Sequence, residues 1–456
     1  MIIFLFIFQS LTIDINERLI KLDSLINIYQ SKEFYSCKGK NLSKDFSNYW
    51  IIGYKEGRKE DTKILIEKIG GRIIKESKTG GNYLLVYLPS FQLINEDFIN
   101  YFEPSVKLKV CFLPNDEFYL DYQWDKWVMY SDLIWDFEIG KKDIIVAICD
   151  QGIDYYHPDL KDNFSFELIG YDFVDNDSNP YPDNENEYHG THVAGIVAGV
   201  INNHIGISGW AQVRLLAVRV LDENGEGSDF DVAEGIRWAS NNGAKIINLS
   251  LGTENYSSVL KEAIEYAYKK GVLLIGASGN NGTANIFYPA KFKEVIACGA
   301  LDKNTNLAYF SNYGKEQELV ACGVEILSTI PNNQYSLLDG TSMSAPQVSG
   351  VASLILSSFP YLNNYQLRAI LNVGTIDLGE KYWDRYYGFG LLNAYYTYLI
   401  AQEYVYREYS KKIEKNKQNY LKEEFYNVLG NKIKDRKRKM VYFLRKGNFF
   451  QKRIDF

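Results

Sequence analysis

Between residues 142 and about 394, short apolar runs alternate with longer segments of helical periodicity. The apolar runs predict strands at 144–149, 215–220, 245–249, 272–277 and 295–300. The helical segments lie at 192–200, 229–241 and 257–270, and a fourth begins at Ser342. Strands that are apolar on both faces and separated by helices form covered parallel sheets. We therefore predict an α/β fold of three layers, with a mostly parallel sheet between helices.

Charged and glycine-rich segments directly follow several of these predicted strands. Asp150 follows the first strand, and the segments 250–252 and 276–280 end or follow two others. Ligands of parallel sheets bind outside the carboxyl ends of the strands. We therefore expect the functional site at this edge of the sheet.

Ser342 lies in the segment DGTSMSAPQVSG (339–350), at the start of a predicted helix of small residues. Several backbone N–H groups have no intrahelical partner at a helix start. One interpretation of Ser342 is an ordinary N-cap. The other is a nucleophile whose transient oxyanion is held by those N–H groups. A serine nucleophile needs a nearby base, and that base needs a carboxylate to orient it.

Asp150 and His189 are the candidates for this carboxylate and this base. His189 opens the segment HGTHVAG, where glycines allow another backbone to approach closely. Either residue alone is more often structural, but the order Asp150, His189, Ser342 together favours nucleophilic catalysis. The chain has four histidines, and the other three candidates for the base are His157 before a proline, His192 one turn into the helix and His204 in a polar turn.

Residues 113 to about 398 resemble subtilisin-like serine proteases, of the thermitase-like branch. The resemblance rests on motifs in the same order, including VAICDQGIDYYHPDL, HGTHVAGIVAG, LLAVRVLDENGEGS, GAKIINLSLG, GNNGTANIFYPA and LDGTSMSAPQVSGVASLIL. It implies that Asp150 orients His189, that His189 is general base and acid, and that Ser342 attacks the peptide carbonyl. It also implies that Asn280 is the side-chain oxyanion donor; a turn residue before Gly282 is the alternative.

The resemblance further implies where substrate binds. The pocket for the residue before the cleaved bond would be walled by two segments, Ser250, Leu251, Gly252 and Ala277, Ser278, Gly279. Phe287 would form its floor, or else be a core aromatic. Since neither wall offers a carboxylate for a buried cation, we expect cleavage after uncharged, mainly apolar residues. Gln151 departs from the family, which has a small residue there, and predicts an altered fit with the chemistry retained.

A structural Ca²⁺ is the cofactor that the resemblance implies. Such cations prefer six to eight oxygen ligands from carboxylates, amides and carbonyls. The implied ligands are Asp116, Asp159, Asn203 and the carbonyls of Val200, Ile205 and Ile207. The acidic residues Asp172, Asp175 and Asp177 could form a second site or a solvated turn.

The flanking regions predict a secreted zymogen. Residues 1–12 are expected to be a signal peptide, with a buried N-terminal strand as the alternative. Residues 13–112 form the expected propeptide region, whose inhibitory α+β domain covers about 45–110 and carries predicted strands at 49–53 and 83–87. The peptidase domain is expected at 113–400. The charged segment 401–456 predicts solvated helix or disorder, with a basic interaction arm as the alternative.

Composition narrows the class of partner. The net charge of −7 favours no general attraction to nucleic acid, and no apolar run is long enough to span a bilayer. The five cysteines show no metal-binding spacing. Cys149, Cys298 and Cys322 lie in apolar strand-like runs, so buried free thiols are expected there. We predict a monomeric serine endopeptidase with protein or peptide substrates and its own propeptide as inhibitor. The alternative is a catalytically silent, peptide-binding relative. An α/β-hydrolase is excluded because the chain lacks a Gly-x-Ser-x-Gly elbow and has a different triad order.

Overall fold

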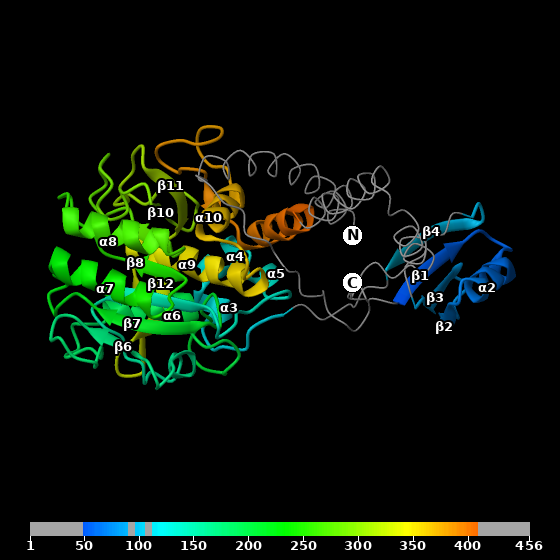
Figure 1. The fold of residues 1–456 in the computed structure, drawn as a ribbon, viewed down its shortest axis with the longest axis horizontal. Helices are drawn as coiled ribbons and strands as arrows, with labels where there is room; N and C mark the ends of the chain where they lie inside the picture. The colour runs from blue at the N-terminus through cyan, green and yellow to red at the C-terminus, as the bar shows by residue number, and fades with distance from the viewer. Residues whose placement is uncertain (1–48, 90–95, 105–111, 409–456) are drawn as a thin grey trace, which may run out of the picture. The chain divides into compact units, whose positions relative to one another are not determined.

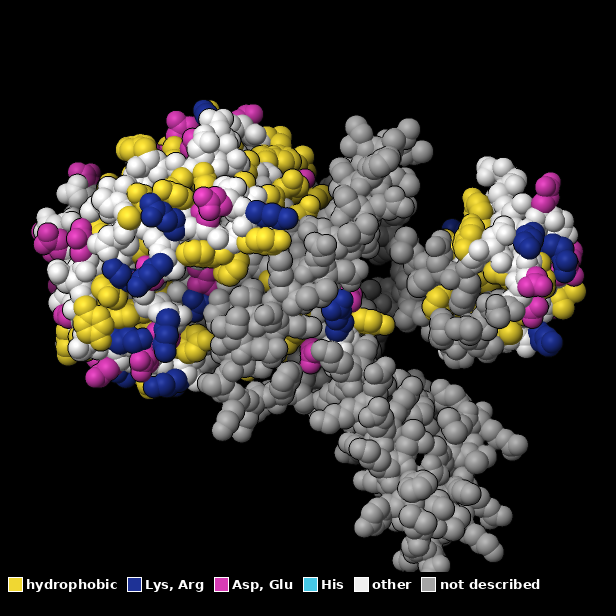
Figure 2. Space-filling model, turned by 90° about the horizontal axis from the view of Figure 1, so that it is seen from above, with side chains coloured by type: hydrophobic (Ala, Val, Ile, Leu, Met, Phe, Trp, Pro, Cys, Tyr) yellow, Lys and Arg dark blue, Asp and Glu magenta, His cyan; other side chains and the backbone are white. Residues whose placement is uncertain are grey.

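The computed structural model describes residues 49–89, 96–104 and 112–408, which form two units (Figure 1). The small unit lies before residue 105, and the large unit lies after residue 111. Within the described residues, no helix has both the length and the apolar character needed to cross a membrane. Figure 2 shows hydrophobic, basic and acidic side chains interspersed on the visible face of the large unit.

A nine-stranded sheet forms the centre of the large unit. Its strands are β5 (Ile145–Asp150), β6 (Gly170–Asp172), β7 (Arg214–Arg219), β8 (Ile246–Leu249), β9 (Leu273–Ala277), β10 (Val295–Leu301), β11 (Gln317–Cys322), β14 (Thr375–Ile376) and β15 (Leu391–Leu392). Their order is β14-β15-β11-β10-β9-β8-β5-β7-β6, and every neighbouring pair is parallel except β14–β15. The predicted mostly parallel sheet is therefore confirmed.

Helices cover both faces of this sheet. Successive residues of a strand point to opposite faces, so strands that are apolar throughout need cover on both sides. Val146 and Ile148 share a core with α6 (His189–Ala198) and α9 (Thr341–Ser358). Ala147 and Cys149 share another with α7 (Asp229–Asn241) and α8 (Ser258–Lys269). The buried cysteines Cys149, Cys298 and Cys322 are free thiols, whereas Cys37 and Cys111 lie outside the described residues.

Two helix starts differ from the sequence-based expectation. Helix α6 begins at His189 rather than at residue 192, because its first turn contains no apolar residue that would give a periodic signal. Helix α9 has Gly340 at its N-cap and Ser342 as its second residue. The interpretation of Ser342 as an ordinary N-cap is therefore wrong.

Shorter elements complete the large unit. A two-stranded hairpin of β12 (Ile326–Ile330) and β13 (Gln334–Leu338) leads into α9. The remaining elements are α3 (Tyr119–Tyr122), α4 (Trp124–Val128), α5 (Ser131–Ile134), the 3₁₀ helix η1 (Lys161–Asn163), α10 (Asn364–Val373) and a final helix over 394–408.

The small unit has the α+β composition predicted for it. Its elements are β1 (Tyr49–Tyr54), α2 (Lys59–Lys68), β2 (Arg72–Glu76), β3 (Tyr83–Tyr87) and β4 (Ile99–Pro104). The strands form an antiparallel sheet in the order β2-β3-β1-β4. Ile52, Leu84 and Val86 of the sheet and Ile66 of the helix form its buried core.

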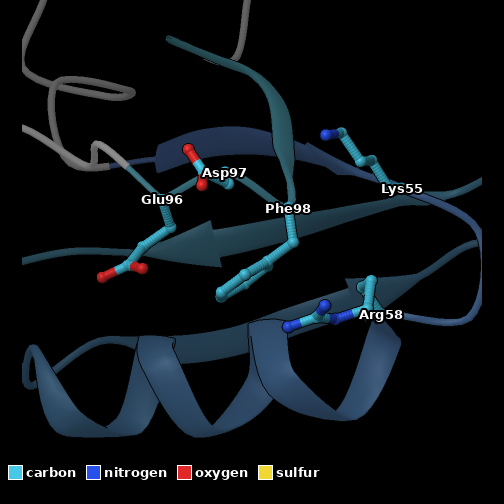
Figure 3. A pocket seen from close by; sticks show the side chains of 5 residues that line it. All are labelled: Lys55, Arg58, Glu96, Asp97 and Phe98. Carbon is cyan, nitrogen blue, oxygen red and sulfur yellow. The ribbon is translucent and has the colours of Figure 1, made fainter.

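A cavity of about 470 Å³ opens on the small unit and is lined by Lys55, Arg58, Glu96, Asp97 and Phe98 (Figure 3). The Arg58 guanidinium lies over the Phe98 ring, 4.8 Å from its centroid, and pairs with Asp61. None of the predicted catalytic residues belongs to this unit, so the chemistry must be sought in the large unit.

Candidate active site

Asp150 and His189 meet at the carboxyl edge of the sheet. Asp150 is the last residue of β5 and is 1% exposed, while His189 is the first residue of α6. His189 Nδ1 lies 2.8 Å from Asp150 Oδ1. Glycine makes this approach possible, because a Cβ on Gly190 would lie 2.1 Å from the Gly152 carbonyl oxygen.

This contact controls the protonation of His189. Burial lowers the pKa of His189, whereas the negative charge of Asp150 and the hydrogen bond to it raise this pKa. The two raising effects together outweigh burial, so the pKa of His189 lies above its ordinary value. Donation of the Nδ1 proton to Asp150 leaves Nε2 as the basic nitrogen. The side chain of His189 keeps 25% of its surface exposed, so Nε2 chemistry with a substrate is sterically compatible with this placement.

Ser342 is partly exposed near the start of α9, and Ser250 holds it there. The Ser342 hydroxyl donates to the Ser250 carbonyl oxygen at 3.2 Å, and the Ser250 hydroxyl donates to the Ser342 carbonyl oxygen at 2.8 Å. No hydrogen bond joins Ser342 to His189 among the described residues. Catalytic hydrogen bonds are often long in the absence of substrate and tighten when it binds.

Asn280 faces the start of α9 with a defined orientation of its amide. Its Oδ1 accepts hydrogen bonds from the Thr341 backbone N–H (2.9 Å) and the Thr341 hydroxyl (2.8 Å). The Nδ2 group is thereby turned away from Thr341 and is left to donate elsewhere. A Cβ on Gly340 would lie 3.5 Å from both Asn280 Nδ2 and the Ser342 backbone nitrogen, so glycine keeps the space beside both donors open.

A cavity of about 260 Å³ adjoins Ser342 and Asn280. Five of the residues predicted for the substrate pocket line it: Leu251, Gly252, Ala277, Gly279 and Phe287. Gly252 and Gly279 both lie against Phe287, since a Cβ on either would meet the Phe287 side chain at 3.1 Å. Phe287 is half-buried and reaches the cavity, so it is not simply a core aromatic.

The other two predicted wall residues do not line this cavity. Ser250 instead binds Ser342, and the buried Ser278 hydroxyl donates to the Asn312 carbonyl oxygen. Asn281 and Thr341 line the cavity although they were not predicted to do so. Their positions beside Asn280 and Ser342 in the sequence were the available signal.

Gln151, the departure beside Asp150, points toward the turn that follows β7. Its Nε2 donates to the Asp222 carbonyl oxygen at 2.9 Å, and its backbone N–H donates to Asp150 Oδ1 at 2.8 Å. The buried side chain therefore leaves the Asp150–His189 contact intact.

The predicted calcium ligands converge on one loop. Asp116 accepts hydrogen bonds from the backbone N–H groups of Asn202 and Asn203, and Asp159 accepts from Ile207 N–H and the Asn203 amide. Both carboxylates are buried, and burial raises the pKa of Asp159 to about 7. No basic side chain pairs with either carboxylate in the described part of the chain. Two buried carboxylates without a basic partner, hydrogen-bonded to the same 202–207 loop, are ligands of the kind that a hard cation prefers, so the side chains fit the implied ion.

The second acidic loop is organised by an arginine. Arg219 is 1% exposed, and its guanidinium lies 2.6 Å from Asp172 and 2.8 Å from Asp175. Asp183 and Glu187 also pair with it. Asp177 instead accepts a hydrogen bond from the Asn179 N–H. Arg219 therefore offsets one of the four carboxylate charges that pair with it, and both interpretations of the loop, a second cation site and a solvated turn, stay predictions.

Comparisons with known proteins agree with this geometry. The subtilase family model matches residues 141–390, more than half of the chain. A thermophilic serine proteinase of Bacillus sp. strain AK1 is 41% identical over 304 residues, covering 66% of this chain and 73% of that protein. Thermitase of Thermoactinomyces vulgaris is 39% identical, covering 62% of this chain and 98% of thermitase.

The solved structures include a match of the same kind. A protease from Pseudoalteromonas arctica aligns with a TM-score of 0.57 and 31% identity, covering 63% of this chain and 99% of that one. The parallel sheet, the Asp–His contact and the serine at a helix start define a hydrolase of the subtilisin-like class. The chain belongs to the subtilase family, and the prediction of a subtilisin-like serine endopeptidase is confirmed.

Proposed function

We propose that Asp150, His189 and Ser342 form the catalytic triad that hydrolyses peptide bonds through an acyl-enzyme. Ser342 Oγ attacks the peptide carbonyl carbon while His189 Nε2 takes its proton. His189 then returns the proton to the leaving amine, and the steps repeat with water as nucleophile. The 2.8 Å contact between His189 Nδ1 and Asp150 carries the proposal, because it orients the ring and stabilises the imidazolium that forms.

The oxyanion of each tetrahedral intermediate would be held by Asn280 Nδ2 and the Ser342 backbone N–H. The support is the pinned Asn280 amide and the open space beside Gly340. Donors that are fixed in place before the reaction stabilise developing charge without the cost of reorganisation.

The substrate class is proposed to be proteins or peptides with an uncharged, mainly apolar residue before the cleaved bond. The supporting feature is the 260 Å³ cavity, in which Phe287 packs against two glycines and no carboxylate lines the wall. A buried cationic side chain without a partner would be strongly unfavourable there.

We propose that the protein is secreted as a monomeric zymogen, that Ser342-dependent cleavage between about residues 104 and 115 cuts off the small unit, and that this unit inhibits the peptidase domain until it is degraded. The support is the order of the units and the α+β fold of the first. The expected signal peptide, the cleavage region up to residue 111 and the tail beyond 408 lie outside the described residues. A Ca²⁺ held by Asp116, Asp159 and Asn203 would supply a structural cross-link only.

Labelling by a fluorophosphonate probe tests the triad directly. The wild type should be labelled and should shorten by the mass of its leading region, whereas Ser342→Ala should remain unlabelled and uncut. A folded wild-type protein that neither reacts with the probe nor cleaves peptides would favour the silent peptide-binding alternative. Normal shortening of Ser342→Ala expressed alone would overturn self-processing. The proposed triad would then still be tested by the probe labelling.

A further inference from the structure

The chain has three histidines besides His189, and two of them, His157 and His192, are fully buried against the β12–β13 hairpin. His192 lies one turn after His189 in α6, and His157 lies seven residues after Asp150. His204, in contrast, is exposed. Neither buried ring contacts Ser342, so their burial calls for another explanation.

His192 joins α6 to both strands of the β12–β13 hairpin. Its Nε2 lies 3.1 Å from the Ile326 carbonyl oxygen on β12 and 3.0 Å from the Ser336 carbonyl oxygen on β13. Two acceptors at one nitrogen require that Nε2 carries the proton, which leaves Nδ1 as the bare nitrogen. Nδ1 is buried and has no hydrogen-bond partner in the described structure, so no acceptor there favours the other tautomer.

The rest of the interface holds the same two elements together. The hydroxyls of Ser328 and Thr329 donate to the carbonyl oxygens of His192 and Thr191 at 2.7 and 2.8 Å. Glycine allows this approach, since a Cβ on Gly195 would lie 2.3 Å from both hydroxyl oxygens. The helix that begins with His189 is therefore packed directly on β12.

The other catalytic segments contact the same hairpin. His157 Nε2 lies 3.2 Å from the Gln334 carbonyl oxygen, which ties the segment after Asp150 to β13. Strand β13 ends at Leu338, and only Asp339 and Gly340 separate it from the helix that contains Ser342. The hairpin thus contacts or continues into each segment that carries a triad residue.

We propose that His192 is a positioning residue whose Nε2–H clamps the two hairpin strands to α6 and thereby sets His189 relative to Ser342. The inference rests on the triad proposed above. Burial lowers the pKa of His192 to about 3, and the nearby His189 also lowers it, so the ring stays neutral and keeps this tautomer. A displacement of about 1 Å between reacting groups costs on the order of 10²-fold in rate.

Three full-length variants test this role. His192→Leu removes the donor and should lower kcat about 10- to 100-fold with little change in KM. His192→Gln can return an N–H near the position of Nε2 and should recover most of kcat. Asn364→Leu is the matched control, because the buried Asn364 amide also donates to two carbonyl oxygens, those of Tyr268 and Val272, and none of these three residues is hydrogen-bonded to the triad in the described structure. It should lower Tm and leave kcat unchanged.

Equal kcat losses in His192→Leu and Asn364→Leu at matched stability, or no recovery in His192→Gln, would overturn the proposal. Nitrogen NMR on the Ser342→Ala protein, with His192→Gln assigning the signal, supplies a measurement that needs no unstable variant. His192 should be neutral with the proton on Nε2 at both pH 5 and pH 8. An Nδ1–H tautomer or a charged ring would refute the clamp. An inactive wild type would instead refute the proposed function.

Discussion

Thr341→Val is expected to weaken catalysis through Asn280. The Thr341 hydroxyl is buried, and together with the Thr341 N–H it fixes Asn280 Oδ1. Valine keeps the shape and the backbone bond but removes one of these two hydrogen bonds. The Asn280 amide should then sample orientations in which Nδ2 no longer faces the oxyanion.

The magnitude follows from the loss of one of the two restraints. A hydrogen bond of this kind contributes about 0.5–1.5 kcal/mol net. If the whole of this free energy is lost from the stabilisation of the transition state, kcat falls about two- to tenfold, since about 1.4 kcal/mol corresponds to a factor of ten in rate. Asn280→Ala should cost far more, on the order of 10²–10³, which is the loss known for such a donor in subtilisin itself.

Steady-state kinetics on a peptide substrate measure this effect, at a temperature well below Tm. The Gly279 N–H donates to the Thr341 hydroxyl, so the variant will also lose stability. Thr397→Val is the control, because it removes a buried hydroxyl that, among the described residues, donates to the Asn393 carbonyl oxygen at the start of the final helix. In an Asn280→Ala background, Thr341→Val should change kcat less than about twofold. A full two- to tenfold loss in that background, or an effect on KM alone, would refute the reasoning.

Three further predictions concern pH, calcium and specificity. Because Asp150 raises the pKa of His189, kcat/KM should fall as pH drops through a midpoint above 6.5, and Asp150→Asn should lower that midpoint; a wild-type midpoint below 6.5 would contradict the assignment. Chelation should lower Tm by several degrees in a thermal melt, since a ligand at 100 times its Kd contributes about 2.7 kcal/mol, and an unchanged Tm would count against the Asp116–Asp159 site. Phe287→Gly should shift a peptide-library profile toward larger side chains before the cut, whereas dominance of Arg or Lys in the wild-type profile would refute the apolar pocket.

The sequence by itself determined the parallel sheet and the pairing of Asp150 with His189 at its edge. The apolar runs had the right length and composition for buried strands, and the segments around Asp150, His189 and Ser342 carried specific motifs. Four strands of this sheet were not predicted. The strands β6, β14 and β15 have only two or three residues and carry no periodicity, and β11 begins with the polar residues Gln317 and Glu318.

Only the tertiary structure decided which polar groups line the site and which hold the surrounding segments in place. Ser250 bonds Ser342 across 92 positions of sequence, and Arg219 pairs with four carboxylates around the acidic loop. His192 was a candidate base until its ring was seen buried against the hairpin. These roles depend on hydrogen-bond and ion-pair partners that are distant in the chain. A local residue pattern indicates the chemistry of a side chain, but it does not indicate which distant group that side chain will contact.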